Sequence, residues 1–123
     1  MSVFSEKPAL FGEIATRIKA FVERRGGPEI DITPSHYYLN ISLQGVDKGR
    51  ALQVLCRELG VDKKDVAGIG DTEGDLPLRE AVGFFACPSN AKPAIKEAAD
   101  YVSSFPTLEG VLDILTRTEF ARE

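Results

Sequence analysis

Apolar residues recur at helical spacing in the first part of the chain and alternate with polar residues in the part that follows. Over residues 10–25 they lie three or four positions apart, mostly with charged side chains between them. This pattern predicts an amphipathic helix, which the Gly-Gly-Pro sequence at 26–28 ends. Residues 29–33 alternate, and residues 36–43 are rich in Tyr and Ile. Both patterns are typical of strands, and we expect the two segments to form a short antiparallel pair.

From residue 45 onward, helical patterns alternate with short apolar runs. They predict helices over residues 48–59, 76–81, 91–99 and 108–118, and strands over residues 65–69, 83–86 and 101–102. Strands that are separated by helices of this length form a parallel sheet with helices on its faces. Right-handed crossovers then place the carboxyl ends of all the strands on one side of the sheet.

The predicted fold class is therefore α/β, with a partial Rossmann-like parallel sheet that has helices on both faces. A small α+β segment precedes the sheet, so we expect the chain to divide into residues 1–44 and residues 45–123. Parallel sheets are normally covered on both faces and protected at their edges. A sheet of three strands is small, and we expect this one to be incomplete.

The composition, with 43% hydrophobic and 28% charged residues, is that of a soluble globular chain. The net charge is −4 and basic residues are scattered among acids. This distribution argues against nucleic acid as the main partner, because phosphate binding needs a basic patch. No apolar run approaches the ~20 residues that a membrane span requires. Cys56 and Cys87 lack CxxC spacing and no export signal opens the chain, so we expect a cytoplasmic location.

The strand predicted to end at residue 69 leads into a turn that carries the acids Asp71, Glu73 and Asp75. In an α/β sheet, ligands bind at the carboxyl ends of the strands. Two carboxylates four residues apart across such a turn can converge on one hard cation. Mg²⁺ fits best, because it needs few carboxylates and keeps waters or substrate oxygens as other ligands. The pattern is equally typical of an acidic turn in which Asp71 or Thr72 caps the next helix, and both interpretations stay open.

A second candidate is Lys48, which opens a predicted helix directly after an extended segment. The helix dipole disfavours a lysine at this end. A lysine combined with free backbone N–H groups nevertheless makes a phosphate-binding corner. Asp47 is expected to cap the same helix. The alternative interpretation is a solvent-exposed lysine, since lysines mostly lie at the surface.

A third candidate is Asn90, which follows the strand predicted over residues 83–86. Its side chain is expected to cap the next helix or, alternatively, to reach into the same cleft as the acidic turn. His36, the only histidine, has no partner pattern and is expected to be a structural or surface residue. The serines lack a nucleophile-elbow context, which excludes a Ser-His-Asp hydrolase.

Together these stretches resemble the haloacid dehalogenase-like phosphatases, over about residues 36–115. In that superfamily, a lysine opens a helix before a strand that ends in a GDxxxD-type loop. Here Lys48 corresponds to that lysine, and the sequence GDTEGD at 70–75 corresponds to the loop, with Asp71 and Asp75 as its aspartates. The subtype is similar to the Cof, sucrose-phosphate and archaeal phosphoglycolate phosphatases, whose cap is inserted between the two halves of the core.

The resemblance implies a role for each candidate residue. Lys48 is expected to steady the phosphate and the aspartyl intermediate, and Asn90 to lie near the substrate. Asp71 and Asp75 are expected to hold Mg²⁺ directly or through water. The first 44 residues are expected to be a remnant of the cap, and the remainder the C-terminal half of the core.

Two departures from the family pattern bear on these roles. Gly74 stands where the family usually has Asn before the second aspartate, which affects a polar contact but not the metal ligands. The DxDxT nucleophile motif is missing, because no two aspartates of the chain are separated by one residue. In the family, one aspartate attacks phosphorus and a second serves as acid and then base. That reaction is not expected to run on this chain alone.

Two functional hypotheses follow. The chain is the C-terminal portion of a Mg²⁺-dependent phosphatase for a phosphorylated small molecule, of phosphoglycolate or sugar-phosphate type. A complementary chain or an upstream region then supplies the nucleophile. Alternatively, it is a non-catalytic remnant or cation-binding module that self-associates as a homo-oligomer through its open sheet edge. A small α/β signalling domain is a weaker interpretation, because it leaves the arrangement of Lys48 and Asp75 unexplained.

Overall fold

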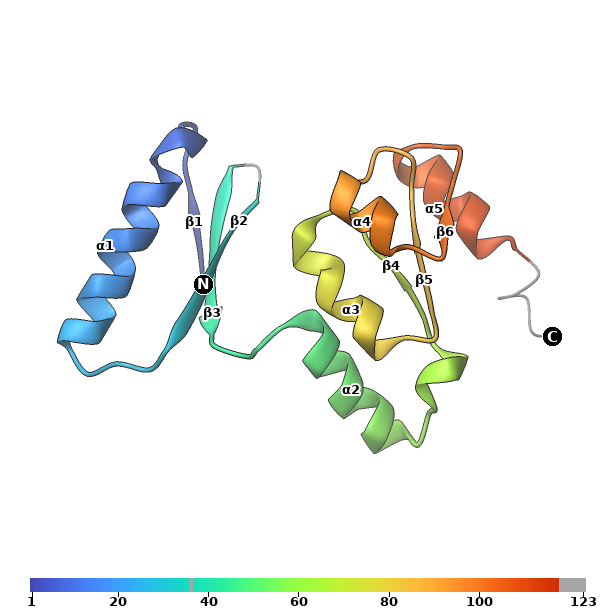
Figure 1. Ribbon diagram of the computed structural model, residues 1–123, viewed down its shortest axis with the longest axis horizontal. Helices are drawn as coiled ribbons and strands as arrows, with labels where there is room; N and C mark the ends of the chain where they lie inside the picture. The colour runs from blue at the N-terminus through green and yellow to red at the C-terminus, as the bar shows by residue number, and fades with distance from the viewer. Residues whose placement is uncertain (36, 118–123) are drawn as a thin grey trace. The chain divides into compact units, whose positions relative to one another are not determined.

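The structure, a computed structural model, describes residues 1–35 and 37–117. The chain forms two compact units, the first ending at Val46 and the second beginning at Asp47 (Figure 1). The first contains an antiparallel sheet, and the second contains a parallel sheet, which confirms the predicted α/β class. His36 lies outside the described residues, so the role expected for it stays a prediction.

The first unit consists of one helix and a three-stranded antiparallel sheet. In chain order its elements are β1 (Ser2–Phe4), the 3-10 helix η1 (Pro8–Leu10), α1 (Phe11–Arg24), β2 (Ile30–Ser35) and β3 (Tyr38–Leu43). The expected antiparallel pair is confirmed, with Ile32 opposite Ile41. β1 completes the sheet on the other side of β3. Its three residues are too few for a pattern in the sequence to predict it.

One face of this antiparallel sheet is apolar. Residues directly opposite each other point to the same face, so Ile30, Ile32, Leu39 and Ile41 share one side. Leu39 is buried, and Phe11 is the buried residue of α1, which packs on β2. The apolar stripe predicted for the helix therefore meets the apolar face of the sheet.

The second unit alternates helices with parallel strands. Its elements are α2 (Lys48–Leu59), η2 (Lys63–Asp65), β4 (Ala67–Ile69), η3 (Glu73–Asp75), α3 (Leu76–Ala81), β5 (Phe84–Cys87), α4 (Pro93–Ala98), β6 (Tyr101–Val102) and α5 (Thr107–Leu115). The strand order is β4-β5-β6, and both pairings are parallel. The strand that carries the acidic loop, β4, is therefore at one edge of the sheet.

The core of the second unit lies on either side of β5. Phe85 and Cys87 point to one face, where they pack with Ile95 of α4 and with partly buried residues of α2 and α3. Ala86 points to the other face and is also fully buried, as is Ile114 of α5. Figure 1 shows α3 and α4 on one side of the strands and α5 on the other. None of the helices in the described part of the chain is long and apolar enough to cross a membrane.

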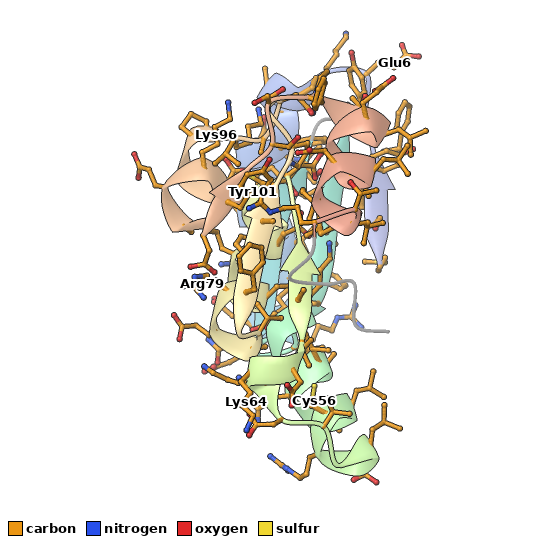
Figure 2. All side chains as sticks on the ribbon, turned by 90° about the vertical axis from the view of Figure 1, so that its right-hand side faces the viewer. Glu6, Cys56, Lys64, Arg79, Lys96 and Tyr101 are labelled. Carbon is orange, nitrogen blue, oxygen red and sulfur yellow. The ribbon has the colours of Figure 1, made fainter. Side chains whose placement is uncertain are left out.

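Most predicted boundaries are close to those observed, and the differences have local causes. Asp62 caps a 3-10 turn that contains Lys64, so β4 begins at Ala67 rather than at residue 65. Figure 2 labels Lys64 in this turn. The helix expected over 91–99 is shorter, because Pro93 opens it. The last helix begins at Thr107, and Thr118 lies outside the described residues.

Two glycines fix the helix that carries Lys48. Gly60 ends α2 in the left-handed conformation, with φ of 66°, as the sequence predicts. Gly49 is buried at the start of α2, where a Cβ atom would lie 2.0 Å from the carbonyl oxygen of Pro77. Only a residue without a side chain allows this approach. The first turn of α2 is thereby held against the first turn of α3.

Candidate phosphate- and metal-binding site

The close approach of α2 and α3 brings Lys48 to the acidic loop. Asp47 caps α2 as expected, because its Oδ1 accepts from the backbone N–H of Arg50 at 2.8 Å. The Nζ atom of Lys48, the next residue, donates a hydrogen bond to Oδ1 of Asp75. The lysine side chain is 62% exposed and its carboxylate partner 8%. The ammonium group therefore joins the loop while keeping access to a ligand from solvent.

Asp75 is the most heavily bonded residue of the loop. Its Oδ2 atom accepts from the backbone N–H groups of Asp71 at 3.1 Å and Thr72 at 3.2 Å, and from the Thr72 hydroxyl at 3.3 Å. Burial raises the pKa of the Asp75 carboxyl group, but the hydrogen bonds from Lys48 and the loop amides outweigh it and hold the pKa below its ordinary value. Asp75 is ionised and holds the loop closed.

The capping interpretation of this turn is also confirmed. Thr72 is the N-cap of η3 and forms a capping box with Asp75. Gly70 makes room for this arrangement, since a Cβ atom there would lie 2.4 Å from Cβ of Asp75. Capping and the contact with Lys48 thus use different oxygen atoms of one carboxylate.

Asp71 differs from Asp75 because its backbone is held while its side chain is exposed. Its N–H donates to Asp75, and its carbonyl oxygen accepts from the N–H of Lys92 at 3.0 Å. The second bond joins the loop after β4 to the loop after β5. Among the described residues, no hydrogen bond or ion pair is recorded for the Asp71 carboxylate. The carboxylate is therefore a positioned and accessible oxygen ligand.

The described residues contain no group of three or more His, Cys, Asp or Glu side chains that could hold a metal ion. The donor set suits a cation that keeps several waters, because Asp71 offers free oxygens and Asp75 has committed its own to hydrogen bonds. Mg²⁺ fits such a site only if further oxygen ligands come from substrate, water or another polypeptide. The expected pair of metal ligands therefore consists of one accessible carboxylate and one that chiefly holds the loop.

Asn90 has a different role from the one expected first. The helix after β5 begins at Pro93, with Lys92 as its N-cap and no side-chain cap, so Asn90 does not cap it. Instead its Oδ1 atom accepts from the backbone N–H of Thr107 at 2.7 Å, at the start of α5. The two helix starts lie close together, which the sequence could not indicate. Contact of Asn90 with a substrate stays a prediction.

A groove lies beside the first turn of α2, which carries Lys48. It has a volume of about 410 Å³ and runs along α2 and α3, lined by Asp47, Gly49, Arg50, Gln53, Val54, Arg57, Pro77 and Glu80. Neither Lys48 nor the acidic loop lines this groove. The groove along α2 and α3 is therefore distinct from the corner at Lys48 and the acidic loop.

A further polar cluster, not indicated by the sequence, lies at the end of β6. The Asp113 carboxylate of α5 accepts from the Tyr101 hydroxyl at 2.8 Å and from the Ser103 hydroxyl at 2.7 Å. The Arg117 guanidinium lies 3.8 Å from the centre of the Tyr101 ring, which Figure 2 labels. The hydrogen bonds from Ser103 and Tyr101 lower the pKa of Asp113. This cluster fixes one flank of α5 to the end of β6.

The fold and the site define an α/β protein with an aspartate loop at the end of a parallel strand and a lysine beside it. Residues 3–115 match the haloacid dehalogenase-like hydrolases, and the chain belongs to this family. The predicted membership of this family, which rested on Lys48, Asp71 and Asp75, is therefore confirmed.

Curated relatives and solved structures agree with this assignment. The chain is 35% identical over 89 residues to a phosphoglycolate phosphatase of Methanothermobacter thermautotrophicus, a match of 72% of this chain and 40% of the relative. It resembles a Thermoplasma acidophilum structure with a TM-score of 0.72 and 28% identity, covering 88% of this chain and 47% of the other. A haloacid dehalogenase-like hydrolase from Bacteroides thetaiotaomicron matches with a TM-score of 0.71 and 25% identity, covering 93% and 41%. The chain thus spans less than half the length of these proteins.

Proposed function

We propose that this chain supplies the magnesium- and phosphate-binding half of a phosphatase centre that hydrolyses the phosphoric monoester of a small molecule. The observation that supports this most is the contact of Lys48 with Asp75 beside the fixed backbone of Asp71. The side chain of Lys48 and the backbone N–H of Asp71 thereby both bond to Asp75 after the carboxyl end of β4, where α/β proteins bind ligands. Phosphoglycolate is the first substrate to test, because curated relatives are phosphoglycolate phosphatases.

Each residue contributes a distinct part of the chemistry. Lys48 offers an ammonium group that attracts phosphoryl oxygens, and its bond to Asp75 restricts its position. Asp71 is the residue best placed to hold Mg²⁺, and Asp75 acts chiefly by ordering Lys48 and the loop. A bound magnesium ion would offset the negative charge of the phosphoryl group. All these contributions are electrostatic, and the attack on phosphorus requires a nucleophile from another segment of polypeptide.

Metal binding by the isolated chain can be measured without any turnover. Mn²⁺, a paramagnetic substitute for Mg²⁺ that accepts the same oxygen ligands, should broaden the NMR signals of Asp71 and Thr72 most strongly. Asp71→Ala should abolish this selective broadening. Glu73→Ala is the matched control, since Glu73 is an exposed acid of the same loop. Equal loss in both variants would mean that the loop attracts cations only by its net charge, and would refute the assignment of Asp71.

Phosphate binding tests Lys48 in the same way. With Mg²⁺ present, Lys48→Ala should lose the chemical-shift changes that phosphoglycolate produces in the acidic loop. Lys64→Ala is the control, because Lys64 is also an exposed lysine but precedes β4, at the opposite end of the strand. Shift changes that survive in Lys48→Ala would place the phosphate elsewhere.

The alternative function is a non-catalytic cation-binding module that self-associates. The open edge at β4 favours it, because unpaired strands pair readily with other chains. It predicts a stable homo-oligomer in sedimentation experiments and no hydrolysis of phosphoglycolate or p-nitrophenyl phosphate in any mixture. Mg²⁺-dependent hydrolysis that requires both Asp71 and a complementary polypeptide would exclude this alternative.

A further inference from the structure

The groove between α2 and α3 is a second concave surface of the second unit, and it is not lined by Lys48 or the acidic loop. The two helices lie side by side in Figure 1, with Gly49 of α2 against Pro77 of α3. Every residue that lines the groove belongs to these helices or to the N-cap of α2, so the chain itself supplies both walls. The volume of about 410 Å³ is in the range of small-molecule sites.

The α2 wall of the groove carries two arginines, Arg50 and Arg57. They are two helical turns apart on one face of α2, with Cα atoms about 10 Å from each other. Both residues are exposed, and within residues 1–35 and 37–117 no hydrogen bond or ion pair is recorded for either guanidinium group. A guanidinium group donates through a planar fork that matches the oxygens of a carboxylate or a phosphate. The described part of the chain therefore leaves two anion-binding groups unpaired on this wall.

The surface between the two arginines is partly apolar. Val54 lies between them in the sequence, lines the same groove and is 49% exposed, and Pro77 lines the groove from α3. Gln53 adds an amide that can donate or accept. No aromatic side chain is among the described residues that line the groove, so a nucleotide base would find no ring to stack on. These neighbours suit a flexible aliphatic chain between two charged ends.

Two acids also line the groove, and they act differently on an anion. Asp47 is committed to the cap of α2, because its Oδ1 atom accepts from the backbone N–H of Arg50, and the helix dipole offsets its charge. Glu80 of α3 is exposed, and its charge opposes an anion in the groove. The two arginines are therefore opposed by one uncommitted acid, whose removal should improve the binding of an anion.

We propose that this groove binds an aliphatic molecule with two anionic groups. Arg50 binds one of these groups and Arg57 the other, while the carbon chain packs on Val54 and Pro77. Carboxylate and phosphate groups share the chemistry that the two guanidinium forks recognise. The site is separate from the proposed phosphatase centre and does not rest on the proposed function.

NMR titration of the full chain, without metal ions, tests this with two probes. Suberate carries two carboxylates, and hexane-1,6-diphosphonate carries two phosphonates that a phosphatase cannot hydrolyse. Both should shift the backbone amide signals of α2 and α3 along the groove, and the tighter probe identifies the anionic group that the site prefers. Octanoate, with the same carbon chain as suberate but one carboxylate, should bind about fivefold more weakly or worse, because it can engage only one arginine.

Substitutions in the groove give effects of opposite sign. Arg50→Gln and Arg57→Gln should each weaken the binding of suberate by about fivefold, since each removes one of the two contacts. Glu80→Gln should strengthen it, because the opposing charge is lost. Lys96→Gln is the control, because it removes one positive charge from an exposed lysine of α4 that does not line the groove, and it should leave binding nearly unchanged (Figure 2). All four residues are exposed, so thermal midpoints should show that every variant is folded.

Four results would overturn the proposal. Absence of shifts in the groove at millimolar suberate would mean that the site does not bind dianions, and octanoate binding as tightly as suberate would leave only one anion contact. Equal weakening by Arg57→Gln and Lys96→Gln would reduce the effect to net charge. Weaker binding in Glu80→Gln would mean that the occupant also carries a cation.

The proposed function can fail without affecting this site, and the reverse also holds. Lys48→Ala and Asp71→Ala should leave the shifts that suberate produces in the groove unchanged. Arg57→Gln should leave the Mn²⁺ broadening of the Asp71 signal unchanged. Loss of suberate binding in Asp71→Ala would contradict the separation of the two sites.

Discussion

The loops that follow β4 and β5 occupy equivalent places in the fold but use their polar residues differently. Both leave a parallel strand at the same edge of the sheet, and the bond from Lys92 N–H to the Asp71 carbonyl joins them. In the first loop, Asp75 gathers the hydrogen bonds and leaves the Asp71 carboxylate accessible. In the second loop, Asn90 commits its oxygen to the start of α5. A polar side chain at the end of a strand is more available to a ligand when neighbouring residues make the hydrogen bonds to the backbone of the loop.

Among the substitutions that test this comparison, Asp75→Ala should have the largest effect on stability. Four donors from Lys48, Asp71 and Thr72 would lose their acceptor at a residue that is only 6% exposed. We expect the free energy of unfolding to fall by about 2–4 kcal/mol, measured by urea denaturation. Asp71→Ala should change it by less than about 0.5 kcal/mol, because that side chain is exposed. Equal destabilisation by the two substitutions would contradict the division of roles between the aspartates.

Substitutions at two glycines of the loop after β4 can be compared directly and should have a smaller effect on stability. A Cβ atom at Gly70 would overlap Asp75 at 2.4 Å, whereas the nearest atom to one at Gly74 is the Thr72 hydroxyl at 3.9 Å. Gly70→Ala should therefore cost about 1–3 kcal/mol of stability by overpacking. Gly74→Asn, which introduces the residue usual in the family, should stay within about 0.5 kcal/mol. The thermal midpoints of the two variants test this, and a large loss for Gly74→Asn would contradict the open space at that position.

Removing the side chain of Asn90 tests the structural role of the second loop. Asn90→Ala deletes the acceptor of the Thr107 N–H and should lower the free energy of unfolding by about 1 kcal/mol. Broadening of the Asp71 signal by Mn²⁺ should be unchanged. A variant with full stability but impaired binding of phosphoglycolate would show instead that Asn90 is a substrate residue.

The smallest effect concerns Asp113 of α5, which accepts hydrogen bonds from Tyr101 and Ser103 at the end of β6. Its pKa is lowered in the folded state by the Ser103 and Tyr101 hydroxyls, so it stabilises the fold above the unfolded value of 3.8. That contribution should be lost as the pH falls below 3.8 through the folded pKa. Ser103→Ala should reduce the difference in urea midpoint between pH 7 and low pH, and Ser104→Ala serves as a neighbouring control. An unchanged difference would mean that the Ser103 hydroxyl does not lower the pKa of Asp113 in the folded state.

Local patterns were sufficient to predict most elements. The bounds of α2 and α3 follow directly from Asp47, Gly60 and the apolar spacing, because caps and periodicity are local properties. β1 escaped prediction, since a three-residue strand is recognised only by its partner. The start of β4 was misplaced because the capping of η2 by Asp62 competes with the strand pattern.

The candidate residues could be chosen from the sequence, but their contacts could not. The spacing of Asp71 and Asp75 indicated a cation site or a capping turn. Asp75 forms the capping box with Thr72 and the contact with Lys48. The sequence could not show that Asn90 bonds to Thr107, because the two residues are separated by a strand and a loop. Such pairings depend on how consecutive βα units pack, which no local pattern specifies.

The sequence by itself determined the family and the parallel order of strands and helices, and it indicated the candidate residues Lys48, Asp71, Asp75 and Asn90. Only the tertiary structure decided which carboxylate holds the loop and which stays accessible. It also joined Asn90 to the start of α5. The physical reason is that side chains of the same type differ in burial and in hydrogen-bond partners once the chain has folded. Identical residue types acquire different roles only when the chain has folded.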